Sequence, residues 1–230
     1  MIVYGKQISL YILDNFPEII EEIYLQKEID KKLFYKFSNL GKKIIKLDPK
    51  KAQSMAKGGN HQGFLLGIKD IEFADFQEVK NQSGFLLVLY NITDIGNIGA
   101  IVRTAYAFGV DAVIVTAQKN FSLEPVIRSS AGAMLNMPMV LYTNALDLVN
   151  ELKMAGYKTY GAGFKGEDIR SVAFLNKKAV FLGSEGEGIP RKILSKLDKQ
   201  ITINMVRDFD SLNVSAATAI ICDRIANGQC

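Results

Sequence analysis

From residue 84 onward, continuous apolar runs alternate with stretches that have helical spacing. The first run, Phe85–Tyr90, has no polar alternation, as expected of a strand that is buried on both faces. Further strands are predicted at Ala112–Val115, Met139–Tyr142, Ala179–Leu182 and Ile201–Met205. Because strands that alternate with helices form parallel sheets covered on both sides, the pattern predicts an α/β fold with a largely parallel sheet.

Three helices are predicted between and after these strands. One follows Tyr90 and begins near Asn97; it carries an apolar stripe with Arg103 off it. A second spans residues 144–155. The third is apolar, runs from about Leu212 to Ala226, and has Ser211 at its N-cap position, where a hydroxyl accepts a bond from an unpaired backbone N–H.

The first 70 residues have a different pattern, typical of a small α/β unit. Strands are predicted at 19–25, 43–47 and 64–68, a helix at 31–40, and a short helix from Pro49, since proline suits a first helical turn. The pattern weakens between residues 69 and 83. We therefore expect an N-terminal domain at 1–70, a linker at 71–83 and a larger domain at 84–230.

Composition is that of an ordinary soluble protein: 230 residues, 48% hydrophobic and 23% charged. No apolar run approaches the ~20 residues that span a bilayer, and the first residues do not resemble a signal peptide. We expect a cytoplasmic protein that does not bind membranes. The single histidine, His61, and the two cysteines, Cys222 and Cys230, match no metal-ligand spacing, so no metal is expected.

Charge is unevenly placed. Ten lysines lie between Lys27 and Lys57, against Glu28, Asp30 and Asp48, which is a local excess of seven positive charges. Such an excess suits a polyanion such as RNA. A solvated, lysine-rich helix face explains the charges equally well.

Three polar or glycine-rich turns are candidates for chemistry. In Asn97–Arg103, a helix N-terminus after a strand offers backbone N–H groups, and the arginine can hold a phosphate through two hydrogen bonds. In Gly183–Gly188, three glycines permit close backbone approach around Glu185 at the end of a strand. The third, Ser211–Ala217, combines a helix start with small residues. Taken singly, each is also explained as an ordinary helix cap or turn.

A fourth segment, Gly161–Gly166, matches the G-x-G-x-x-G pattern of dinucleotide sites, with Glu185 about 20 residues on. It lies in mid-domain with a short crossover to the next strand. We interpret it as a loop, and NAD-dependent dehydrogenation remains a weaker alternative.

The set of motifs N-x-G-x-x-x-R (97–103), G-S-E-G-E-G (183–188) and S-L-N-V-S (211–215) resembles the three motifs of the SpoU/TrmH branch of SPOUT RNA methyltransferases. The N-terminal part, from Tyr4-Gly5 to His61-Gln62-Gly63, is similar to the ribosomal-protein-like RNA-binding domain of bacterial 23S rRNA guanosine-2′-O-methyltransferases.

This resemblance implies a homodimer with a deep trefoil knot in its C-terminal domain and S-adenosylmethionine as cofactor. It implies cofactor contacts at Gly183, Ile203 and Leu212, and catalytic positions at Asn97, Arg103, Glu185, Ser211 and Asn213. The expected reaction is methyl transfer to a ribose 2′-hydroxyl, of a guanosine in 23S rRNA. A tRNA substrate, or a non-catalytic protein of ribosome assembly, are the alternatives.

The chain departs from the family pattern at one place. Ile203-Asn204-Met205 replaces the usual I-P-M, and Arg207 and Phe209 follow where smaller residues are common. We expect Asn204 to be tolerated, because it only restores a backbone donor.

Overall fold

The structure, a computed structural model, describes residues 1–184, 186–207 and 211–228. The chain divides into two compact units. The first consists of Met1–Glu72 and Ser122–Gly132, and the second of Phe73–Phe121 and Ala133–Cys230.

The first unit is built on a four-stranded mixed sheet with the order β1-β4-β2-β3. Its strands are β1 (Ile2–Tyr4), β2 (Ile20–Leu25), β3 (Lys43–Lys46) and β4 (Phe64–Ile68). Strands β2 and β3 are parallel, whereas β4 is antiparallel to β1 and β2. The helices are α1 (Lys6–Asn15), α2 (Lys31–Ser38), α3 (Pro49–Met55) and α6 (Glu124–Ser129), with the 3₁₀ turn η1 (Pro17–Ile19). The strands and helices predicted for this region are confirmed, while β1 and α1 were not predicted.

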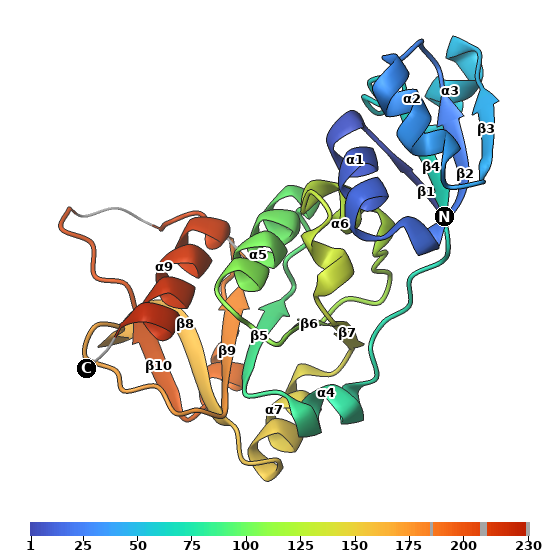
Figure 1. Cartoon of the computed structure of the whole chain (residues 1–230). Helices are drawn as coiled ribbons and strands as arrows, with labels where there is room; N and C mark the ends of the chain where they lie inside the picture. The colour runs from blue at the N-terminus through green and yellow to red at the C-terminus, as the bar shows by residue number, and fades with distance from the viewer. Residues whose placement is uncertain (185, 208–210, 229–230) are drawn as a thin grey trace. The chain divides into compact units, whose positions relative to one another are not determined.

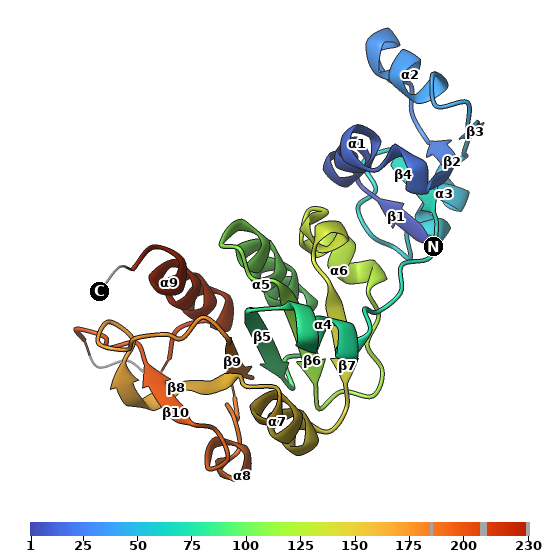
Figure 2. The same cartoon turned by 60° about the horizontal axis from the view of Figure 1, so that its bottom comes forward.

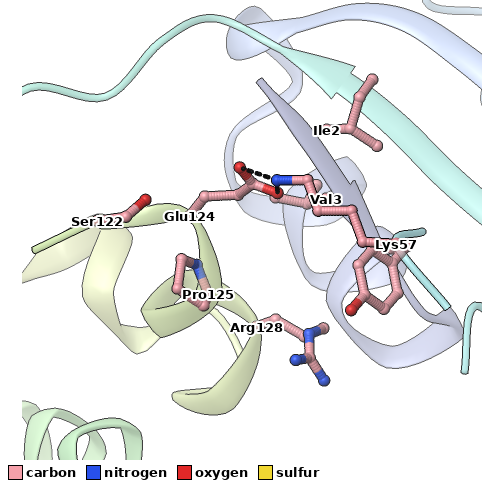
Figure 3. A pocket seen from close by; sticks show the side chains of 8 residues that line it. Ile2, Val3, Lys57, Ser122, Glu124, Pro125 and Arg128 are labelled. Atoms are coloured by element: carbon pink, nitrogen blue, oxygen red, sulfur yellow. Dashed lines mark hydrogen bonds and ion pairs between the residues drawn. The ribbon is translucent and has the colours of Figure 1, made fainter. Parts of the chain in front are cut away.

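Helix α6 joins the first unit although it comes from the middle of the chain. The Arg128 guanidinium lies 4.8 Å from the centre of the Tyr4 ring, and Lys57 Nζ pairs with Glu124 at 3.2 Å. A cavity of about 280 Å³ lies between these groups (Figure 3). The Lys57–Glu124 ion pair and the stacking of Arg128 on Tyr4 both connect α6 to the N-terminal part of this unit.

The second unit contains a six-stranded, all-parallel sheet (Figure 1), where the apolar pattern predicts a largely parallel one. Its order is β10-β8-β9-β5-β6-β7. The strands are β5 (Phe85–Tyr90), β6 (Ala112–Thr116), β7 (Met139–Tyr142), β8 (Lys158–Asp168), β9 (Lys178–Gly183) and β10 (Lys199–Thr202). The central strands β5, β6 and β9 are almost entirely buried, which explains their continuous apolar sequences.

Helices cover both faces of this sheet (Figures 1 and 2). They are α4 (Phe76–Gln82), α5 (Ile95–Ala107), α7 (Ala145–Met154), α8 (Arg191–Leu194) and α9 (Val214–Asn227), with the 3₁₀ turn η2 (Ala133–Asn136). Helices α5 and α9 pack against each other on one face. On the other face, α4, α7 and α8 bury side chains such as Leu148 and Ile193 against Val88 and Phe181.

The segment expected as a linker, 71–83, contains α4. Asp75 caps this helix by accepting bonds from the backbone N–H groups of Gln77 and Glu78. Phe76 and Val79 are buried in the core of the second unit. The linker and the domain bounds themselves stay predictions.

Two predictions about the sheet were wrong. The segment Gly161–Gly166 is part of strand β8, because β8 pairs with β10 on both sides of it. The register jumps between Gln200 and Ile201, so β8 residues 162–166 form a large bulge. Gly166 (φ +156°) closes this bulge; a Cβ there would lie 2.5 Å from the Gln200 carbonyl. Strand β10 ends at Thr202, so Ile203–Met205 lie beyond it.

No helix in the described part of the chain is both long and apolar enough to cross a membrane.

Candidate functional site

The carboxyl edge of the parallel sheet brings two of the sequence motifs to one place. Strands β5 and β9 are hydrogen-bonded neighbours, and their last residues, Tyr90 and Gly183, are register partners. The chain continues from β5 to β6 and β7 on one side, whereas β8 and β10 lie on the other side of β9. Open α/β sheets bind ligands outside the strand ends at such a reversal of strand order.

Helix α5 starts just beyond this edge. Its N-cap is Asp94, whose carboxylate accepts a 2.7 Å bond from the backbone N–H of Asn97. The prediction that the helix begins at Asn97 was wrong by two residues, because an earlier carboxylate takes the cap. Asn97 therefore lies within the first turn and is half-buried.

Helix α9, near the C-terminus of the sequence, starts beside the first turn of α5. Its N-cap is Asn213, whose Oδ1 accepts bonds from the Ser215 backbone N–H at 2.9 Å and from Ser215 Oγ at 2.5 Å. The predicted cap, Ser211, was therefore wrong. The Asn213 side-chain amide also donates a 3.0 Å bond to Oδ1 of Asn97, which joins two motifs 116 positions apart.

The glycine turn after β9 folds back on itself. Ser184 and Gly188 form an isolated bridge, with the Gly188 N–H donating to the Ser184 carbonyl at 2.8 Å. A Cβ on Gly183 would lie 2.2 Å from the Gly188 carbonyl carbon, so only glycine fits there. In contrast, a Cβ on Gly186 or Gly188 would meet open space. Gly186 and Gly188 therefore leave space for close approach to their backbone, while Glu185 lies outside the described residues.

The remaining predicted site residues lie at different distances from the Asn97–Asn213 contact and the turn after β9. Ser211 and Leu212 directly precede the Asn213 cap and are half-buried. Ile203 follows the end of β10, two strands from β9 and therefore roughly 10 Å away across the sheet. Arg103 is exposed on α5, off the buried stripe as predicted, and roughly 9 Å along the helix axis from Asn97.

A carboxylate that the sequence analysis did not single out anchors the chain after β10. Asp168, the last residue of β8, accepts bonds from Arg170 Nε at 3.0 Å and from Asn204 Nδ2 at 2.7 Å. The hydrogen bonds from Arg170 lower the pKa of Asp168 to about 2. Asn204 therefore ties the segment after β10 to β8.

The single histidine and one of the two cysteines also have defined surroundings. His61 Nδ1 accepts a 3.0 Å bond from the Gly63 N–H, as a turn-stabilising imidazole does. Cys222 is buried within α9, and this burial raises the pKa of its thiol to about 12. Across the described ranges, no group of three or more His, Cys, Asp or Glu side chains could hold a metal ion.

Comparison with known proteins identifies the family. Residues 84–223 match the model of the SpoU rRNA methylase family, and residues 2–74 match the model described as RNA 2′-O ribose methyltransferase substrate binding. The chain belongs to the SpoU rRNA methylase family.

Relatives of this SpoU family member cover most of its length. An uncharacterized tRNA/rRNA methyltransferase of Borreliella burgdorferi is 34% identical over 193 residues, covering 78% of this chain and 85% of the relative. A TrmH-family tRNA/rRNA methyltransferase of Staphylococcus haemolyticus, named as putative, is 33% identical, covering 88% of this chain and 86% of the relative.

Solved structures share the fold over the whole chain. The SpoU methyltransferase AviRb from Streptomyces viridochromogenes, in complex with AdoMet, has a TM-score of 0.80 at 21% identity, covering 99% of this chain and 89% of that one. An AdoMet-bound rRNA methyltransferase from Sinorhizobium meliloti has a TM-score of 0.78 at 20% identity, covering 100% and 87%. The predicted family and the α/β fold class are confirmed.

Proposed function

We propose that this SpoU methylase transfers a methyl group from S-adenosylmethionine to a ribose 2′-hydroxyl, of a guanosine in 23S rRNA. The observation that carries the proposal is the Asn97–Asn213 hydrogen bond at the carboxyl edge of the parallel sheet, because it joins two of the three motifs. The N-terminal match to a 2′-O ribose methyltransferase substrate-binding model supports the ribose as the acceptor.

The residues at this edge fit a bound S-adenosylmethionine. The turn 183–188 leaves open space at Gly186 and Gly188, so its backbone can approach a flat ligand closely. In the proposal, Gly183, Ile203 and Leu212 hold the cofactor largely through backbone groups. When bound, the cofactor supplies an electrophilic methyl group on sulfur.

The chemistry requires a positioned hydroxyl that loses its proton. The 2′-hydroxyl oxygen would have to be held in line with the methyl group that the cofactor would supply, and its proton would have to leave to a base. Arg103 is exposed on α5 and is proposed to hold the target phosphate through its guanidinium. Since the pKa of arginine exceeds ~12, the phosphate it holds is a better proton acceptor than Arg103 itself.

The other polar residues are proposed to position these groups. Asn97 and Asn213 hold each other and orient the start of α5 and α9. Ser211 lies just before that cap, and Glu185 is proposed to fix neighbouring backbone. Orientation of this kind supplies several kcal/mol of barrier reduction, on the order of 7 or more in well-aligned cases.

The assembly around this chemistry is also part of the proposal. The family resemblance implies a trefoil knot that encloses the cofactor and a homodimer, and the sequence composition favours a cytoplasmic enzyme. The lysine-rich N-terminal unit is proposed to bind the RNA, mainly through phosphates.

The decisive experiment measures transfer of a tritiated methyl group from labelled cofactor to bulk rRNA and to tRNA, followed by mapping of ribose methylation. Label in a guanosine ribose of 23S rRNA supports the proposal. Label in tRNA alone supports the alternative substrate; the names of the relatives include both tRNA and rRNA. RNA binding without any transfer indicates a non-catalytic assembly protein.

A further inference from the structure

Helix α2 exposes two adjacent aromatic rings. Phe34 is 48% and Tyr35 is 67% exposed, although both are large side chains on a regular helix. The helix is anchored from its other face, where Phe37 is fully buried, and from its N-cap, where Asp30 accepts a bond from the Leu33 N–H. The rings are therefore held outward on a fixed support.

Two lysines lie beside the Tyr35 ring. Lys31 and Lys32 precede Tyr35 by four and three residues, so all three side chains share one face of α2, with Cβ atoms roughly 5–6 Å apart. Both lysines are exposed, and neither side chain forms a hydrogen bond or ion pair with the described part of the chain. Lys36 differs, because it pairs with Asp14 at 2.9 Å.

The aromatic and positively charged side chains of this α2 face favour a nucleic acid over a protein as its binding partner. The cores of protein–protein interfaces are depleted in lysine, so an aromatic pair beside two unpaired ammonium groups suits a protein poorly. A nucleic acid strand suits both parts, since its phosphates meet the lysines and its bases offer flat π-faces to the rings. A base within a duplex is already stacked and is not available to Tyr35.

We infer that the α2 face formed by Lys31, Lys32, Phe34 and Tyr35 binds unpaired nucleotides of the RNA substrate, with a base stacked on Tyr35 and phosphates on the two lysines. This inference rests on the proposed function and deepens it. It makes the substrate an RNA segment with a single-stranded loop or bulge, in place of a regular helix.

The test uses variants of Tyr35 in the full-length protein. Tyr35→Phe keeps the flat ring, whereas Tyr35→Leu keeps an apolar side chain of similar burial but cannot stack. Binding of a fluorescently labelled, mixed-sequence single-stranded RNA is measured beside the same sequence as a duplex. We expect Tyr35→Leu to weaken single-strand binding about tenfold or more, with Tyr35→Phe and duplex binding nearly unchanged.

A second reporter measures stacking directly. The chain contains no tryptophan, so Tyr35→Trp introduces a single fluorophore at the proposed contact. We expect the single-stranded RNA to quench this fluorescence, while duplex RNA at saturation leaves it nearly unchanged. Unquenched tryptophan, or equal binding by Tyr35→Leu and the unmodified chain, would overturn the inference.

Charge and partner controls complete the experiment. Lys31→Gln and Lys32→Gln should each lower the salt dependence of RNA binding by about one unit of slope. Met154→Ala removes an 89% exposed side chain from α7 in the other unit and should change neither measurement. A change in the sedimentation coefficient of the RNA-free protein on Tyr35→Leu would indicate a protein contact and overturn the inference.

Methyl transfer separates this inference from the proposed function. If Tyr35→Trp is quenched by single-stranded RNA but no RNA is methylated, the α2 face stands and the proposed reaction does not. If transfer is measured and Tyr35→Leu binds single-stranded RNA as the unmodified protein does, only the inference about α2 is overturned.

Discussion

The Asn213 side-chain amide donates a 3.0 Å hydrogen bond to Oδ1 of Asn97, and so joins the starts of α9 and α5. The same Asn213 caps α9 through its Oδ1. The Asn213 side chain therefore satisfies a backbone N–H at the start of α9 and also holds α9 against the first turn of α5. Because both starts lie at the proposed cofactor edge, this residue couples local helix stability to the geometry of the site.

Replacing Asn213 with alanine removes both interactions. We expect a loss of about 1 kcal/mol in the free energy of unfolding from the missing cap, together with a strong loss of methyl transfer. Denaturant unfolding and transfer of labelled methyl measure the two effects separately.

Asn144→Ala is the matched control for this variant. Asn144 caps α7 by accepting bonds from the N–H groups of Leu146 and Asp147, and α7 lies on the opposite face of the sheet. We expect a similar loss of stability with transfer retained. Equal loss of transfer in both variants would show that the Asn213 effect is general destabilisation.

The parts of the fold that depend on burial could be predicted, and those that depend on competition between neighbours could not. Phe85–Tyr90 is apolar throughout because both faces are covered, so its pattern is sufficient. In contrast, Asp94 and Asn97 are both good caps three residues apart, as are Ser211 and Asn213 two apart. Intrinsic cap preferences do not distinguish between the two residues in either pair, so the local pattern leaves the choice open.

Glycine-rich segments were ambiguous for a related reason. Gly161–Gly166 has the composition of a loop, yet it forms part of β8, because Gly166 allows the backbone to approach Gln200 closely. The approach of two backbone segments is a tertiary contact. A glycine in the sequence indicates that another group packs closely against it, but does not identify that group. The Asp168–Asn204 contact was missed likewise, since nothing in the spacing joins residues 36 positions apart.

Arg103→Ala tests the proposed grip on the target phosphate. We expect transfer to fall by roughly a hundredfold or more, with the affinity for S-adenosylmethionine nearly unchanged, because Arg103 acts on the RNA. Single-turnover transfer and calorimetric titration of the cofactor measure the two quantities. Arg103→Lys keeps the charge without the two-pronged geometry and should recover only part of the rate. An equal loss of rate and cofactor affinity would contradict this role.

Gly183→Ala tests the turn as a cofactor support. The added Cβ would lie within 2.2–2.6 Å of the Gly188 and Ile189 backbone, so the turn must shift. We expect a marked loss of cofactor affinity in calorimetric titration. Gly163→Ala, where a Cβ meets open space, is the control and should bind the cofactor normally. Normal binding by Gly183→Ala would remove the turn from the proposed site.

The lowered pKa of Asp168 predicts how the free energy of unfolding depends on pH. The pKa of Asp168 is about 2 in the folded protein, against an ordinary value of 3.8, because the hydrogen bonds from Arg170 favour the carboxylate. A lowered pKa contributes stability above the unfolded value, and this contribution falls away as pH drops from about 4 to about 2. Asp168→Asn removes the titrating group. The difference in unfolding free energy between the two proteins should therefore be constant near neutral pH and shrink over that acid range.

The exposed Asp14–Lys36 pair provides the control, because removing a surface ion pair through Asp14→Asn should change stability little at any pH. A difference for Asp168→Asn that stays constant down to pH ~2 would show that the Arg170 contact does not hold in solution.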